Sequence, residues 1–145
     1  MTTEDFEKRK KEILSELVKS ENETLDNLKN LVTKTKPFFF IEGGTGKVIL
    51  SRDIGLKIAD RILLLLIGKY FAFNLDILTE KSLDINKISE ELGGIPKTTL
   101  SKPLGILVNK NLIRKPAEDG LYEITHYFIE DILNDMWKKY KPKGE

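Results

Sequence analysis

Apolar positions recur at helical spacing between residues 3 and 36, a segment without Gly or Pro. They are Leu14, Val18, Leu25, Leu28 and Val32. Spacings of 3, 4 and 7 predict one amphipathic helix or two in succession. Ser20 followed by Glu23 fits a capping box, at which a second helix would start. The stripe either packs on its own domain or pairs with a second subunit, and Glu21 at a seam position weakens a coiled-coil pairing.

Pro37 ends this helical region, and two apolar runs at 38–41 and 48–50 flank a glycine-rich turn. This pattern predicts a β-hairpin. The turn, residues 42–47, also resembles a phosphate-binding loop. However, Ile41 stands where the Walker motif has Gly, and Val48 stands where it has Ser or Thr. A hairpin turn accounts for the glycines through their tolerance of positive φ, so we expect no nucleotide hydrolysis.

The segment from Asp53 to about Phe73 is apolar nearly all round, which predicts a long helix at the centre of the core, with Asp53 as its N-cap. Its unbroken apolar run, residues 62–67, is far too short to span a bilayer. After a connection, Asp84 is expected to cap a short helix that ends at Gly93-Gly94. Ile85, Ile88 and Leu92 share one face of that helix.

Residues 96–110 open with hydroxyls and lysines and close with an apolar face, which predicts a second helix after a tight turn. Leu100, Leu104, Leu107 and Val108 form this face and are expected to pack against Ile85, Ile88 and the long central helix. Pro103 lacks an amide hydrogen and is expected to kink the helix or to shift its start to about Ser101.

Two further elements follow. Asp119-Gly120 lies between two runs with apolar residues and predicts a hairpin directly after the second helix. Residues 126–140 then predict an amphipathic helix. Its apolar positions are Phe128, Ile129, Ile132, Leu133, Met136, Trp137 and Tyr140.

Residues 56–125 resemble the winged helix-turn-helix domain of small archaeal and bacterial transcription regulators. Three pieces carry the resemblance, which covers about half of the chain. They are the helix end at residues 88–93, the start of the recognition helix at 98–104 and the entry to the wing at 111–114. The resemblance implies a DNA-binding fold, although winged helices also serve as protein-interaction modules.

The net charge of +1 conceals a local excess, because residues 96–115 hold five basic residues and no acidic one. On the recognition helix, the candidate DNA contacts are Lys97, Thr98, Thr99, Ser101 and Lys102. In the wing, Arg114 and Lys115 are expected to contact the DNA backbone and to supply affinity rather than sequence choice. Glu118 and Asp119 at the wing tip would repel phosphate.

The expected fold class is mainly α with small β (α+β). Its predicted parts are an N-terminal helical segment (1–36), a β-hairpin (37–52), a winged helix-turn-helix domain (53–125) and a C-terminal helix with its tail (126–145). The chain has no cysteine, which excludes disulfides and thiolate metal sites. Its single histidine, His126, cannot form a zinc site with its neighbours. We expect no cofactor, no metal and no enzymatic activity, because no pair of carboxylates, no Ser/His/Asp set and no metal cluster stands out.

The charged N-terminus has no apolar run typical of a signal peptide, so a cytoplasmic protein is expected. The leading hypothesis is a regulator that binds double-stranded DNA as a homodimer through its terminal helices. The alternative hypothesis is a winged-helix interaction module within a larger nucleoprotein assembly.

Overall fold

The structure is a computed structural model that describes residues 3–17, 21–115 and 120–142, with the side chains of residues 11–26 left undescribed. The chain divides into two compact units, residues 1–31 and 32–145. Helix α1 (Thr3–Leu17) and helix α2 (Glu21–Thr35) confirm the prediction of two helices in succession. The proposed capping box at Ser20 and the side chains of Leu14, Val18 and Leu25 lie outside the described residues.

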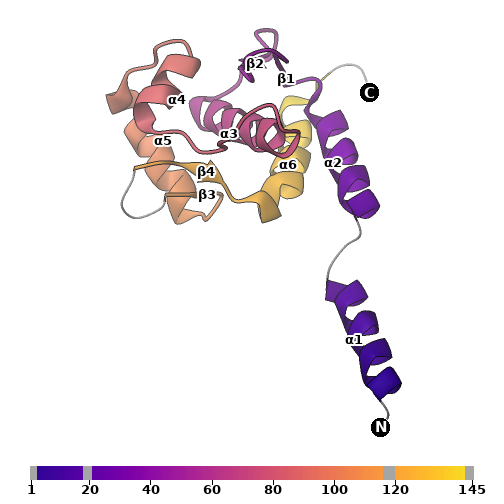
Figure 1. Cartoon of the computed structure of the whole chain (residues 1–145). Helices are drawn as coiled ribbons and strands as arrows, with labels where there is room; N and C mark the ends of the chain where they lie inside the picture. The colour runs from indigo at the N-terminus through magenta and orange to yellow at the C-terminus, as the bar shows by residue number, and fades with distance from the viewer. Residues whose placement is uncertain (1–2, 18–20, 116–119, 143–145) are drawn as a thin grey trace. The chain divides into compact units, whose positions relative to one another are not determined.

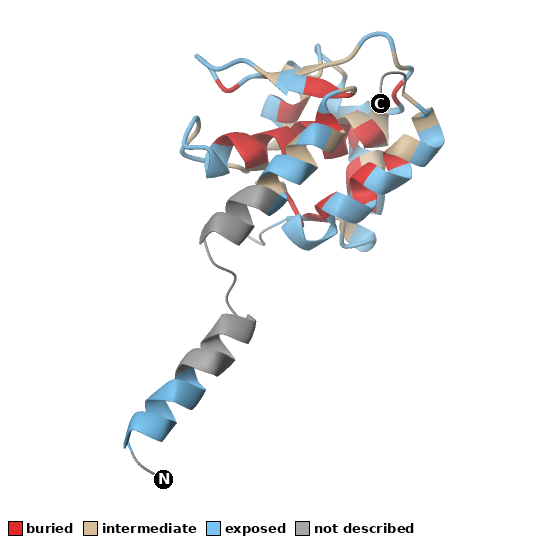
Figure 2. Ribbon diagram, turned by 90° about the vertical axis from the view of Figure 1, so that its right-hand side faces the viewer, coloured by how far each residue is buried: buried red, intermediate tan, exposed pale blue. Residues whose placement is uncertain are grey.

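The second unit is built around helix α3 (Ile58–Asn74), which lies at the centre of Figure 1. Its residues 62–69 are all buried, because the helix carries apolar side chains on nearly every side. Buried residues are red in Figure 2 and gather in the interior of this unit. Strands β1 (Phe39–Ile41) and β2 (Val48–Leu50) form the predicted antiparallel hairpin and contact α3. Within the described residues, no helix has the length and apolar character needed to cross a membrane.

Gly68 shows how closely the hairpin packs on α3. A Cβ atom at this position would lie 2.5 Å from a side-chain carbon of Val48, which is itself buried. Only a residue without a side chain permits this approach of strand and helix.

Asp53 does not cap α3, so the predicted start of this helix is wrong. The helix begins at Ile58 with Lys57 as its N-cap, and no side chain caps it locally. Instead, the backbone N–H of Lys57 donates to Tyr140 Oη at 3.0 Å. Tyr140 lies 83 residues further along the chain, so the sequence around Lys57 could not predict this contact.

The next elements are helices α4 (Ile85–Glu91) and α5 (Lys97–Asn109), which contact each other. Asp84 caps α4 as predicted, accepting from Lys87 N at 2.8 Å. Gly93 and Gly94 adopt φ of +89° and +86°, which ends the helix. Helix α5 runs through Pro103 from Lys97, so its start is not shifted to Ser101.

Strands β3 (Ile113–Arg114) and β4 (Glu123–Ile124) form a second antiparallel hairpin. Leu83, just before α4, forms an antiparallel bridge with Tyr122. Leu83 N donates to the carbonyl of Tyr122 at 2.9 Å, and Tyr122 N donates to the carbonyl of Leu83 at 2.7 Å. The expected turn falls mostly on residues 116–119, outside the described residues, while Gly120 has a φ of +69°. The described residues are thus mainly helical, with two small two-stranded sheets, which confirms the α+β class.

The C-terminal segment begins with a short 3-10 helix, η1 (His126–Phe128), and continues as helix α6 (Ile129–Tyr140). The apolar stripe of α6 is buried in its own unit. Its buried members are Ile129, Ile132, Leu133 and Met136. This stripe, which the homodimer hypothesis placed at a subunit interface, therefore packs within its own unit.

Hydrogen bonds to the buried carboxylate of Asp60 join the end of α6 to α3. Asp60 is buried and accepts hydrogen bonds from Tyr140 Oη and from Lys139 Nζ, the latter at 2.8 Å. Trp137 Nε1 also donates to the carbonyl of Lys34 at 2.8 Å. The bonds to Asp60 hold the end of α6 at the N-terminus of α3, and the bond to Lys34 joins α6 to α2.

We expect Tyr140→Phe to lower the free energy of unfolding by about 1–3 kcal/mol, because it removes a donor from the buried carboxylate of Asp60. Burial and this hydrogen bond raise the pKa of Tyr140 above its usual 10.0. The stability that Tyr140 adds is therefore present below about pH 10 and lost as pH rises further. Urea unfolding at pH 7 and above pH 10 measures both effects. Tyr127→Phe, whose hydroxyl is exposed, is the control and should change stability by less than about 0.5 kcal/mol.

Candidate nucleic-acid interface

Helix α5 has a core side and a solvent side. Leu100, Leu104 and Leu107 are buried, as predicted, while Val108 is half-buried. All five residues that the sequence placed at a DNA contact on this helix are exposed. They are Lys97, Thr98, Thr99, Ser101 and Lys102.

The outermost stripe of α5 follows from helical geometry. At about 100° per residue, the positions opposite the buried leucines are Thr98, Lys102, Gly105 and Asn109. All four are exposed. Sequence reasoning named the first two and missed Gly105 and Asn109, which lie one and two turns further along the same stripe.

The N-terminus of α5 has no side-chain cap. Pro96 occupies the N-cap position and supplies only its carbonyl, which accepts from Thr99 N at 2.9 Å. Ser101 Oγ donates to the carbonyl of Lys97 at 3.0 Å, so its lone pairs remain able to accept from a partner. The first amides of an uncapped helix and its dipole favour an anion at this end.

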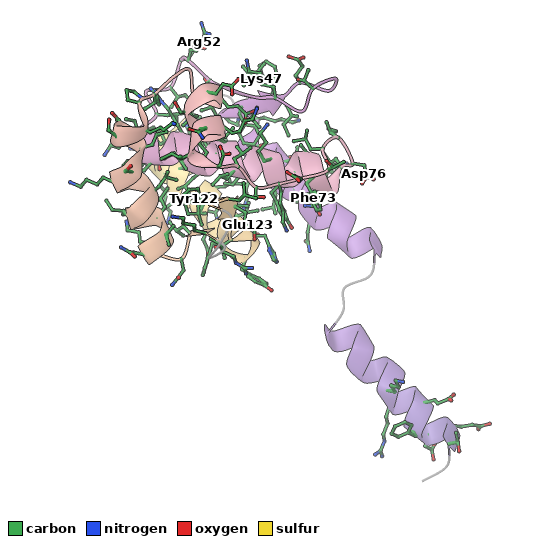
Figure 3. The ribbon with its side chains drawn as sticks, turned by 60° about the vertical axis from the view of Figure 1, so that its left-hand side comes forward. Lys47, Arg52, Phe73, Asp76, Tyr122 and Glu123 are labelled. Atoms are coloured by element: carbon green, nitrogen blue, oxygen red, sulfur yellow. The ribbon has the colours of Figure 1, made fainter. Side chains whose placement is uncertain are left out.

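Arg114 and Lys115 are both exposed, but each has a neighbour that modifies its charge or its reach. Arg114 stands opposite Glu123 in the register of β3 and β4. Lys115 Nζ lies 5.6 Å from the ring centre of Tyr122, a cation–π arrangement. Figure 3 shows Tyr122 and Glu123 together on this hairpin. The basic character of the wing is therefore weaker than the sequence suggested.

Helix α6 leaves the first turns of α5 open. A cavity of about 200 Å³ separates the two helices near the C-terminal half of α5, where Ile106 and Lys110 face Ile132 and Asp135 across it. None of the five α5 contact candidates lines this cavity. Within the described part of the chain, the side chains of these five residues are exposed to solvent.

On this face of α5, the packing of the fold gives no reason for a glycine at position 105. A Cβ atom there would have no other atom within 4 Å, whereas the glycine of α3, Gly68, has no room for one. A glycine in a helix interior costs about 1 kcal/mol relative to alanine. The sequence showed a glycine in a helical pattern, but only the structure shows that no internal contact requires it.

Backbone hydrogen bonds within the glycine-rich turn between β1 and β2 close this turn. Glu42 N donates to the carbonyl of Lys47 at 2.9 Å, and Gly46 N donates to the carbonyl of Glu42 at 2.8 Å. Gly46 has a φ of +73°, as a hairpin turn requires. A strand follows this turn, whereas a phosphate-binding loop leads into a helix.

Comparison of the chain with protein families, with curated proteins and with solved structures finds no match. In the part of the chain that the structure describes, no three His, Cys, Asp or Glu side chains gather in a way that could hold a metal ion.

Proposed function

We propose that residues 56–125 form a winged helix-turn-helix domain that binds double-stranded DNA and regulates transcription. The order of elements supports this proposal: α3, the bridging residue Leu83, α4, α5, and then β3 and β4. In this arrangement α5 is the recognition helix and the β3–β4 hairpin is the wing.

The observation that carries the proposal is the exposure of every basic side chain in an acid-free segment. Residues 96–115 hold five basic side chains and no acidic one. The leucines of α5 face the core and Lys102 lies opposite them. Lys97 shares their side of the helix but is exposed in the first turn. The uncapped N-terminus adds attraction for phosphate at the same end.

In this proposal the hydroxyls of Thr98, Thr99 and Ser101 reach base edges or phosphates while the first turns of α5 lie in a major groove. Arg114 and Lys115 contact the backbone beside it. Since α6 is packed on its own unit, a homodimer would need a surface other than the buried stripe of α6.

Duplex binding measured by fluorescence anisotropy tests the proposal. For about four phosphate contacts, affinity should fall about 100-fold between about 50 mM and about 200 mM salt. Random and promoter-derived duplexes would be compared in parallel, with light scattering to give the mass of the complex. Absence of binding at the lower salt concentration would overturn the proposal and favour the protein-interaction module.

We expect Gly105→Ala to have opposite effects on the fold and on duplex binding. The added methyl group should raise the free energy of unfolding by about 0.5–1 kcal/mol, because it meets no neighbour in the chain. It should weaken DNA binding about tenfold, since it holds the duplex away from the helix backbone. Urea unfolding and anisotropy measure the two effects.

Gly68→Ala is the matched control for this experiment. Its methyl group would meet Val48 at 2.5 Å, so this variant should lose about 1–3 kcal/mol of stability. A Gly105→Ala protein that is stabilised and binds DNA with unchanged affinity would show that no partner approaches this point of the helix.

A further inference from the structure

A row of aromatic rings and one cation lies outside the proposed duplex contacts. It comprises Tyr127, His126, Tyr70, Lys81 and Phe73, and we call it the aromatic row. The ring centres of Tyr127 and His126 are 4.0 Å apart. His126 stacks on Tyr70 at 5.8 Å with an interplanar angle of 1°. Lys81 Nζ lies 5.7 Å from the Tyr70 ring centre and 5.4 Å from that of Phe73.

The aromatic row joins three separate parts of the unit. Tyr70 and Phe73 belong to the last turns of α3, and Lys81 precedes α4. His126 and Tyr127 belong to η1. Figure 3 shows Phe73 beside Asp76 at the α3 end. The fold therefore brings together residues that lie up to 57 positions apart.

The aromatic row is only partly used by the core. Tyr127 is 73% exposed and Phe73 is 37% exposed, and no residue of η1 is buried. Exposed aromatic side chains in contact with one another offer flat apolar faces to a partner. The packing of the unit does not require these faces.

Two basic side chains and one acidic side chain act on the middle of the aromatic row. Burial lowers the pKa of His126 below its usual 6.5, and the charges of Lys81 and Arg114 lower it further, while Glu123 opposes them. At neutral pH the ring of His126 is therefore uncharged. Arg114 belongs to the β3–β4 hairpin, the proposed wing, and its charge acts on His126.

We propose that the aromatic row binds single-stranded nucleic acid by stacking unpaired bases on its rings. Bases would stack on Tyr127 and on the exposed part of Phe73, with phosphates near Lys81 and Arg114. A duplex keeps its base faces stacked inside and cannot use such rings, whereas unpaired bases can. The core of a protein interface is depleted of charged residues, but here Lys81 stands between the rings, which favours an anionic strand.

The test is binding of a labelled oligothymidylate of about 12 nucleotides to the full chain, with an abasic strand of equal length as the comparison. The wild type should bind the thymidylate at least about tenfold more tightly, because only that strand has bases to stack. The His126→Ala/Tyr127→Ala variant should lose this preference, and Tyr127→Trp should keep it. Phe40→Ala, at an exposed ring of the β1–β2 hairpin, should have no effect.

Two results would overturn the inference: equal binding of the thymidylate and abasic strands by the wild type, or an unchanged preference in the double variant. Thermal unfolding checks that the double variant remains folded, as expected for two exposed side chains. Blunt duplex binding should be unaltered in the double variant. Loss of duplex binding through α5 and loss of base stacking at the aromatic row are therefore distinguishable.

Discussion

Glu91→Gln is expected to lower the free energy of unfolding by about 3 kcal/mol, because it leaves the ammonium of Lys69 buried without a counter-ion. Lys69 Nζ lies 2.6 Å from a carboxylate oxygen of Glu91, and the two side chains are only 8% and 16% exposed. The second partner of Lys69 is the carbonyl of Gly46, at 3.4 Å. The loss should fall at the low end for buried pairs, since the Glu91 side chain keeps some contact with water.

The neighbouring ion pair supplies the control. Lys87 and Glu90 are 3.8 Å apart and mostly exposed, so Glu90→Gln should change stability by less than about 1 kcal/mol. Urea unfolding of both variants at pH 7 makes the comparison. The double variant Lys69→Met/Glu91→Leu should recover most of the loss, because it removes the buried charge together with its partner. Equal stability of Glu91→Gln and the wild type would show that Lys69 reaches solvent in the folded protein.

Local sequence predicted those parts of the fold whose causes are local. Asp84 caps α4 because its carboxylate reaches an amide three residues away, and two glycines with positive φ end the helix. The leucines of α5 identified its core side, and hence the exposure of Lys102, through helical periodicity alone. These predictions needed no knowledge of distant residues.

Predictions failed or were missing where the cause lies far along the chain. The start of α3 depends on Tyr140, which is 83 residues from Lys57. Lys69 in an apolar helix was visible in the sequence, but its partner Glu91 was not. The aromatic row is another such case, because its members come from three elements that only the folded chain brings together.

Replacing Lys97, Lys102, Arg114 and Lys115 by Glu is expected to weaken duplex binding at least about 100-fold near 50 mM salt. Each replacement turns an attraction for phosphate into a repulsion at an exposed position. If all four side chains contact phosphates, the slope of log affinity against log salt should become shallower by about 3–4. Anisotropy over a salt series measures the affinity and the slope together.

The control must change the net charge equally without touching this face. Four lysines outside residues 96–115 are exposed and serve this purpose: Lys36, Lys57, Lys138 and Lys141. Replacing them by Glu also takes the formal net charge from +1 to −7, since each substitution changes it by two. A general effect of charge would weaken both variants alike, whereas a defined interface weakens the first far more.

The comparison between the two charge variants therefore decides where DNA binds. Similar slopes and similar affinities in both would mean that the exposed face of α5 and the wing play no special part, and the proposed interface would be rejected. A large loss confined to the first variant would place the phosphate contacts on α5 and the wing. Thr98 and Asn109, on the outermost stripe of α5, would then be the positions at which to look for base readout. Their side chains are exposed and uncharged.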